Sequence, residues 1–402
     1  MKSIVSAMSI IALGFVLVGC PGSGGGGGGT GTVSGSFTRV ALVPNQTDNT
    51  VSVFLVDDAT GQLRPRGYVV SGTSPRAVAV HPSGQFFYTI NGGSNNVSAH
   101  ALSATGLATA VTGSPFSLSP ATGPIAVAVS PNGQFLFVAN QGSSNVSVLS
   151  INQTTGALAE ISSPPFSLAP AVGPTAIAVH PSGNLLFVTN NNPGRLSVFI
   201  IQSTGDLIPL PNPVLLVLNP QALALNETGT VVYVANKGSN SISAFSIDQT
   251  TGDLSLIAGQ PFLTAPGTAP SSVEVGPGGQ FLYVANSGTG TIGLFTIDQV
   301  TGALSAVPAG TASATGANIR IDPSGRTLYA TDSTLNLVSL FSIDPVSGLL
   351  TAAGTRAMKP GPAHWHSSAE RLLSRPRPPS RMSRMPATIP CRPLRSLRLP
   401  VS

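Results

Sequence analysis

The sequence is poor in charge, since only 8% of its 402 residues are Asp, Glu, Lys or Arg. The 19 basic and 14 acidic residues are also unevenly placed, because residues 364–402 hold eight arginines and one acid, Glu370. Without that segment 11 basic and 13 acidic residues remain, a net charge of −2. The overall charge of +5 therefore does not indicate a nucleic-acid partner, which would require a basic patch on the folded part.

Cysteine and known catalytic motifs are scarce as well. The two cysteines are Cys20, which belongs to a targeting segment, and Cys391, so no pair is left for a disulfide. The sequence has no HExxH, Walker-type or GxSxG motif and no His and carboxylate cluster at metal-ligand spacing. We expect no metal, no cofactor and a fold held together by packing alone.

Residues 1–20 are predicted to be a signal peptide. Lys2 precedes an apolar run from Ile4 to Val18, which is too short and wrongly flanked for a membrane span. The run ends in Leu-Val-Gly-Cys, which resembles a bacterial lipobox and implies lipidation of Cys20; the alternative is an ordinary signal peptide with a chance cysteine. The glycine-rich residues 21–36 would then form a flexible tether. We expect a lipid-anchored protein of the cell envelope, at the outer membrane or facing the periplasm in a Gram-negative host and otherwise on the cell surface.

An internal repeat fills the middle of the chain. Copies of one segment, such as GQFLFVANQGSSNVSVLSI from Gly133 to Ile151, begin at successive glycines 49, 50, 46, 50 and 46 residues apart. A shorter copy at Ala41–Val56 precedes them. A fixed period in this range is typical of propellers, solenoids and arrays. The copies begin at Gly84, Gly133, Gly183, Gly229, Gly279 and Gly325.

The pattern inside each copy favours a propeller. A short apolar segment such as Phe135–Ala139 reads as a strand buried on both faces, and an alternating segment such as Ser241–Ile247 follows it. Upstream lies another strand closed by a Pro-x-Gly turn, as in AVAVHPSG from Ala77. With a fourth strand after a Thr-Gly turn, each unit is a four-stranded blade, and no convincing helix interrupts the series.

These motifs resemble the lactonase-like seven-bladed β-propellers, the group around 6-phosphogluconolactonase and the YVTN-repeat surface proteins. The resemblance covers roughly residues 38 to 355 and implies an all-β propeller. It implies lactone hydrolysis less firmly, because the group mixes hydrolases with proteins of no assigned chemistry. The matching residues are FVAN at Phe137–Asn140, FVTN at Phe187–Asn190, YVAN at Tyr233 and Tyr283, and HPSG at His81 and His180.

We assign residues 37–363 to the propeller and predict seven blades. The half-unit at Arg39–Leu63 would be completed by a strand from the C-terminal side, and the last blade would be incomplete. Eight blades are the alternative if the tail once encoded a further blade.

The tail, residues 364–402, drops the repeat pattern. Codons permitted for Trp365–Arg371 and Arg384–Ser396, read in two other frames, can spell blade-like segments. The tail is therefore interpreted as a frameshifted final blade that is disordered in this chain. The alternative is a genuine disordered tail rich in arginine and proline.

Comparison of equivalent positions separates architecture from candidate chemistry. His81 and His180 share their position with other polar turn residues, so we interpret them as turn residues before proline. Tyr88, Tyr233, Tyr283 and Tyr329 share one position with two phenylalanines and are predicted to lie in the core.

Three residues depart from the pattern. Two residues before the HPSG position, four blades carry alanine, whereas the next two carry Glu274 and Arg320. A structural ion pair and an anion or substrate contact are the two readings of this pair. His100 stands where other blades have Phe or Leu, and a locally satisfied core histidine is the alternative to a catalytic role. Glu274, Arg320 and His100 are thus the catalytic candidates.

The sequence favours a surface binding or scaffold protein whose ligand at a propeller face is a small molecule, glycan or protein. The alternative is a lactone hydrolase, which needs a base for water and donors for the oxyanion. The two readings differ in one observable feature. A hydrolase should gather several convergent polar groups at the central channel, and a scaffold should line it with Ala, Ser and Gly.

Overall fold

The computed structural model describes most of the repeat region. Of residues 14–16 only the backbone is described. The other described residues are 39–161, 165–211, 213–215, 218–265, 267–308, 312–314, 318–332 and 335–358. The expected lipidation site Cys20, the tether 21–36 and the tail 364–402 lie outside these ranges.

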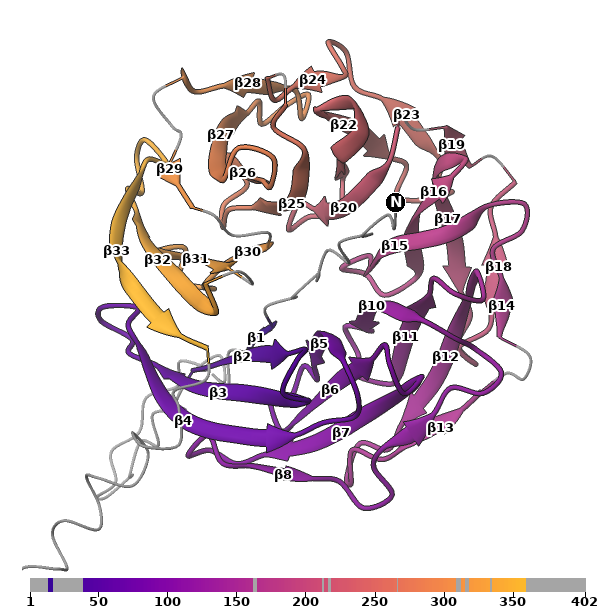
Figure 1. The fold of residues 1–402 in the computed structure, drawn as a ribbon. Coiled ribbons are helices and arrows are strands. Elements are labelled where there is room, and N and C mark those ends of the chain that lie inside the picture. Colours follow the sequence, from indigo (N-terminus) through magenta and orange to yellow (C-terminus); the bar gives the residue numbers. More distant parts are fainter. Residues whose placement is uncertain are drawn as a thin grey trace, which may run out of the picture. The chain divides into compact units, whose positions relative to one another are not determined.

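Seven antiparallel sheets, called blades 1 to 7 in chain order, are arranged in a ring around a central axis, as Figure 1 shows. The innermost strands are β1 (Gly14–Val16), β5 (Pro75–Val80), β10 (Pro124–Val129), β15 (Val172–Val179), β20 (Pro220–Leu225), β25 (Pro270–Val275) and β30 (Asn318–Ile321). The second strands are β2 (Val40–Asn45), β6 (Phe86–Asn91), β11 (Phe135–Asn140), β16 (Leu185–Asn192), β21 (Val231–Asn236), β26 (Phe281–Asn286) and β31 (Thr327–Asp332). The third strands are β3 (Thr50–Val56), β7 (Asn96–Leu102), β12 (Asn145–Ile151), β17 (Gly194–Ile201), β22 (Ser241–Ile247), β27 (Thr291–Ile297) and β32 (Leu337–Ile343).

The outermost strands differ between the ends and the middle of the chain. In blades 1 and 7 the outer strand is long and continuous, as β4 (Leu63–Val70) and β33 (Leu350–Ala357). In blades 2 to 6 it is split into two short pieces that pair with different parts of the third strand. The first pieces are β8 (Ala108–Ala110), β13 (Leu158–Glu160), β18 (Leu207–Pro209), β23 (Leu254–Leu256) and β28 (Leu304–Ala306). The second pieces are β9 (Phe116–Ser117), β14 (Phe166–Ser167), β19 (Val214–Leu215), β24 (Phe262–Leu263) and β29 (Ala312–Ser313).

The core lies between the blades. Second strands such as β11 are buried along their whole length, because each of their faces packs against a neighbouring blade. The buried apolar residues form seven clusters, and each cluster joins two adjacent blades in the described chain. The predicted core tyrosines are confirmed as such, since all four are at most 1% exposed. This packing explains why the sheets can hold without disulfides.

Hydrogen bonds reinforce the same interfaces. Each core tyrosine donates its hydroxyl to the carbonyl of a turn glycine in the next blade, as Tyr233 does to Gly302 (2.9 Å). His81 and His180 lie in turns, as predicted, and each contacts the serine hydroxyl of its own turn. Their Nε2 atoms also donate hydrogen bonds to carbonyl oxygens of the following blade, those of Gly133 (3.1 Å) and Gly229 (2.9 Å). Sequence reasoning did not find this second contact.

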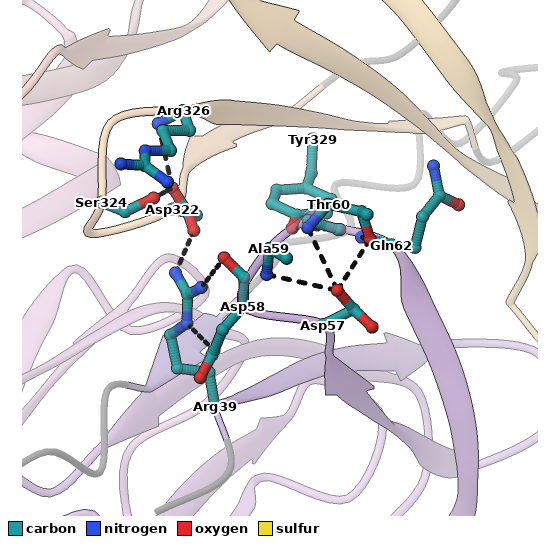
Figure 2. A network of polar contacts seen from close by, with 11 residues as sticks. Arg39, Asp57, Asp58, Ala59, Thr60, Gln62, Asp322, Ser324, Arg326 and Tyr329 are labelled. Atoms are coloured by element: carbon teal, nitrogen blue, oxygen red, sulfur yellow. Dashed lines mark hydrogen bonds and ion pairs between the residues drawn. The ribbon is translucent and has the colours of Figure 1, made fainter. Parts of the chain in front are cut away.

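The ring closes between blades 7 and 1, so the prediction of seven blades is confirmed. One apolar cluster contains Phe54 of blade 1 and Leu340 of blade 7. Tyr329 donates its hydroxyl to Gly61 O at 2.6 Å, and Arg39 forms an ion pair with the buried Asp322 (Figure 2).

Two expectations about closure are wrong. The inner strand of blade 1 is β1, which precedes β2 in the chain and pairs with Val40–Leu42, so it does not come from the C-terminal side. The last blade has four strands, β30 to β33, and is not incomplete. The first error has a simple cause. An apolar segment upstream of the repeats offers the backbone groups that β2 needs, and β1 lies within the residues for which the sequence predicts a signal peptide.

Candidate functional site

The inner strands line a cavity of about 180 Å³ in the channel. On the side of blades 2 to 4 its wall is mainly aliphatic, with small residues such as Ala77, Ala126 and Ala176. Small side chains at these positions leave the space open. Toward blades 5 to 7 the wall becomes more polar, with Gln221, Lys237, Ser271, Ser272, Asn318 and Arg320 beside the apolar Ala222, Leu223 and Val273; Thr175 of blade 4 is a further polar residue of the lining. The channel therefore has one polar side, the feature expected of a hydrolase.

A bulge near the start of the inner strands sets where these side chains point. In β15, β20 and β25 the register with the second strand shifts directly after a proline of the inner strand. The extra residues at these bulges are Thr175, Gln221 and Ser271. Bulges at the rim of a barrel redirect a side chain without breaking the sheet. A hydrogen bond holds the side chain of Thr175 in place, because its hydroxyl donates to Pro220 O of the next blade at 2.8 Å.

Glu274 of β25 and Arg320 of β30 form an ion pair between neighbouring inner strands. This arrangement was one of the two readings of their sequence positions. The side chains remain 20% and 45% exposed, and Arg320 itself lines the cavity. Burial raises the pKa of Glu274, although the guanidinium of Arg320 opposes the shift. Glu274 is the one carboxylate among the described residues of the inner strands.

Lys237 is a channel residue that the sequence analysis missed. It begins the short 3-10 helix η1 (Lys237–Ser239) directly after β21, and it lines the same cavity as Arg320. Burial lowers the pKa of its ammonium group. The repeats contained a signal, because the residues that directly follow the equivalent asparagine of the second strand in blades 2, 3, 4 and 6 are Gly92, Gln141, Asn191 and Ser287. None of them is charged.

His100 lies away from the channel, in the third strand β7. It stacks on Phe87 with ring centres 4.8 Å apart, and its Nε2 donates to Val70 O of blade 1 at 3.0 Å. Its exposure is 1%, and its Nδ1 has no partner in the described chain. The structure thus brings Glu274 and Arg320 together and places His100 in the interface of blades 1 and 2.

We expect His100→Phe to make the protein less sensitive to acid. Burial lowers the pKa of His100, while the unfolded chain keeps a value near 6.5. Stability from neutral His100 is thus complete above about pH 6.5 and is lost as the pH falls toward the folded-state pKa. Phenylalanine, which occupies this position in five blades, takes up no proton.

Urea denaturation midpoints of the two proteins at pH 5 and pH 8 measure the effect. The stability difference between them should grow in favour of His100→Phe as the pH falls, by at most about 1.4 kcal/mol per pH unit. Other titrating groups, including His81, are common to both proteins and cancel. A difference that stays constant between pH 5 and pH 8 would contradict the assignment.

Within the described ranges, no group of three or more His, Cys, Asp or Glu residues could hold a metal ion. The same part of the chain contains no helix long and apolar enough to span a membrane.

Comparisons with known proteins agree with this architecture. The family described as "Lactonase, 7-bladed beta-propeller" matches residues 34–120, 114–268 and 259–365. A candidate 6-phosphogluconolactonase from Bacteroides uniformis has a TM-score of 0.68 at 20% identity, over 78% of this chain and 96% of that one. The periplasmic gluconolactonase of Pseudomonas aeruginosa has a TM-score of 0.67 at 19% identity, over 79% and 95%. At such identities the likeness concerns the fold. No curated protein sequence matches the chain significantly.

Proposed function

The chain belongs to the lactonase family of seven-bladed β-propellers, and from this premise we propose that it hydrolyses a small lactone in its central channel. The observation that carries the proposal is the polar side of the channel. Arg320 and Lys237 line one cavity, at positions where most other blades have uncharged residues, and Glu274 forms an ion pair with Arg320. A scaffold role, which the sequence favoured, gives no reason for this concentration of charge.

The geometry supports a division of roles between these groups. A lactone carbonyl near Arg320 and Lys237 would meet two cationic donors, which stabilise the oxyanion formed when water attacks the carbonyl carbon. The Glu274 carboxylate would accept the proton of that water, because burial brings its pKa closer to neutrality than that of a solvated glutamate. The ring C–O bond then breaks, Glu274 returns the proton to the departing oxygen, and a hydroxy acid results.

The same cationic groups favour an anionic product or substrate. Two positive side chains line the cavity, whereas the neighbouring carboxylate is already paired with Arg320. Two of the structural neighbours are described as a candidate 6-phosphogluconolactonase and a periplasmic gluconolactonase. Glucono-1,5-lactone and its 6-phosphate are therefore the first substrates to test.

Acid release from both lactones by the purified full chain tests the proposal. The rate must be compared with spontaneous hydrolysis in the same buffer, because these lactones also open without an enzyme. We expect saturable hydrolysis above that background. His100→Phe is a suitable control, since His100 does not face the channel. Saturable binding of either lactone with no acceleration would instead support a binding protein.

A further inference from the structure

The histidines of the HPSG turns show how the gap between two blades is filled. In blade 4 the imidazole of His180 contacts Ser182 Oγ at 2.6 Å and Gly229 O of blade 5 at 2.9 Å. The ring occupies the gap fully, because a Cβ added to Gly229 would lie 2.1 Å from His180 Nε2. His81 and Gly133 repeat this arrangement between blades 2 and 3.

The gap between blades 5 and 6 lacks this ring. The residue equivalent to His180 is Asn226, whose side chain turns back to contact Val231 N at 2.9 Å and Thr228 Oγ1 at 3.0 Å. The opposite carbonyl, Gly279 O, receives a bond from Gln299 Nε2 at 2.8 Å. A Cβ added to Gly279 would meet nothing closer than 3.7 Å. Thr228 and Gly279 thus keep the hydroxyl and the carbonyl that hold an imidazole elsewhere.

A cavity of about 380 Å³ lies at this place, and Asn226, Thr228 and Gly279 line it. Its charged lining residues are Glu227 and Asp298, and none of the lining residues is basic. Hydrogen bonds from Thr301 and Val300 hold the pKa of Asp298 below its usual range, so this carboxylate stays ionised. The cavity therefore suits a cation. Apolar side chains such as Ile297 offer contact to the face of a planar ring.

We propose that the cavity between blades 5 and 6 binds an imidazole ring that the chain does not itself supply. The ring comes either from a small imidazole compound or from an exposed histidine of a partner peptide. One ring N–H donates to Gly279 O, as Nε2 of His81 and His180 does to Gly133 O and Gly229 O, and the other ring nitrogen contacts Thr228 Oγ1. The protonated ring is favoured, because Glu227 and Asp298 lie beside it.

Titration of the full chain with imidazole, followed by thermal shift and by NMR of the ligand, tests this site. We expect saturable binding with a Kd of about 1–10 mM, as befits a ligand of few atoms. Binding should be tighter at pH 6 than at pH 8. N-methylimidazole, which lacks one donor, should bind several-fold more weakly. A Gly-His-Gly peptide should match imidazole if the natural ligand is a histidine side chain and should bind much more weakly if it is a small molecule.

Two variants decide whether binding occurs at this cavity. Asn226→His would supply the missing ring and should abolish imidazole binding while raising the melting temperature. Glu227→Gln changes an exposed side chain and should weaken binding roughly two- to five-fold without loss of folding. Absence of saturable binding, or unchanged binding in both variants, would overturn the proposal. Neither result depends on lactone hydrolysis, so the two proposals fail separately.

Discussion

Arg320→Met is expected to reduce kcat/KM for lactone hydrolysis by about 10²- to 10³-fold, which is the usual cost of removing one oxyanion donor. The substituted side chain keeps most of the length of arginine but carries no donor. It also leaves Glu274 without the ion pair that holds it beside the cavity. Initial rates of acid release at several substrate concentrations give kcat and KM separately. The loss should lie mainly in kcat if Arg320 acts on the transition state.

A matched arginine and the paired glutamate provide the controls. Arg76→Met makes the same change on β5, outside the residues that line the cavity, and should leave the rate unchanged. Glu274→Gln should lower kcat and remove the fall in activity at acidic pH. That fall is expected because hydrolysis needs the carboxylate form, whose pKa burial has raised. Equal losses in Arg76→Met and Arg320→Met would show that the effect is not specific to the site.

The fold was largely predictable because every blade of a propeller has to bury the same strands in the same way. Every second strand packs between two neighbours, so the same apolar segment recurs, as at Phe135–Asn140. The identity of β1 could not be predicted in this way. β1 lies outside the repeats and joins the sheet through backbone hydrogen bonds to the edge of β2. Its three residues, Gly14–Val16, have no distinctive sequence pattern.

The site was predictable only where a charge replaced alanine on an inner strand. Glu274 and Arg320 met that condition, and their contact follows from equal positions in adjacent blades. Lys237 was missed because its position lies in a variable loop and was not compared between blades. The contact from His180 to Gly229 joins residues 49 apart in the chain. Sequence alone does not show which atoms of neighbouring blades meet.

Asp322→Ala is expected to destabilise the propeller by about 3–5 kcal/mol, because it removes the buried partner of Arg39 and leaves only the exposed Asp58. Arg39 and Asp322 join blades 1 and 7, and their side chains are only 10% and 2% exposed (Figure 2). Arg39 keeps its ion pair with Asp58 in the variant, and an arginine side chain does not lose its proton in proteins, so the guanidinium stays charged. The midpoint of urea unfolding measures the change.

Two further variants separate ring closure from a general loss of charge. Asp58→Ala removes the other partner of Arg39, but that carboxylate is 65% exposed, so we expect a cost of about 1 kcal/mol or less. The double variant Arg39→Met and Asp322→Ala should be more stable than Asp322→Ala alone, because no unpaired charge remains buried. Part of the cost should persist, since Asp322 also accepts a bond from Ser324 at 2.7 Å in its own turn. If the double variant is no more stable than the single one, the ion pair does not hold the ring closed, and the contact between Tyr329 and Gly61 together with apolar packing must do so.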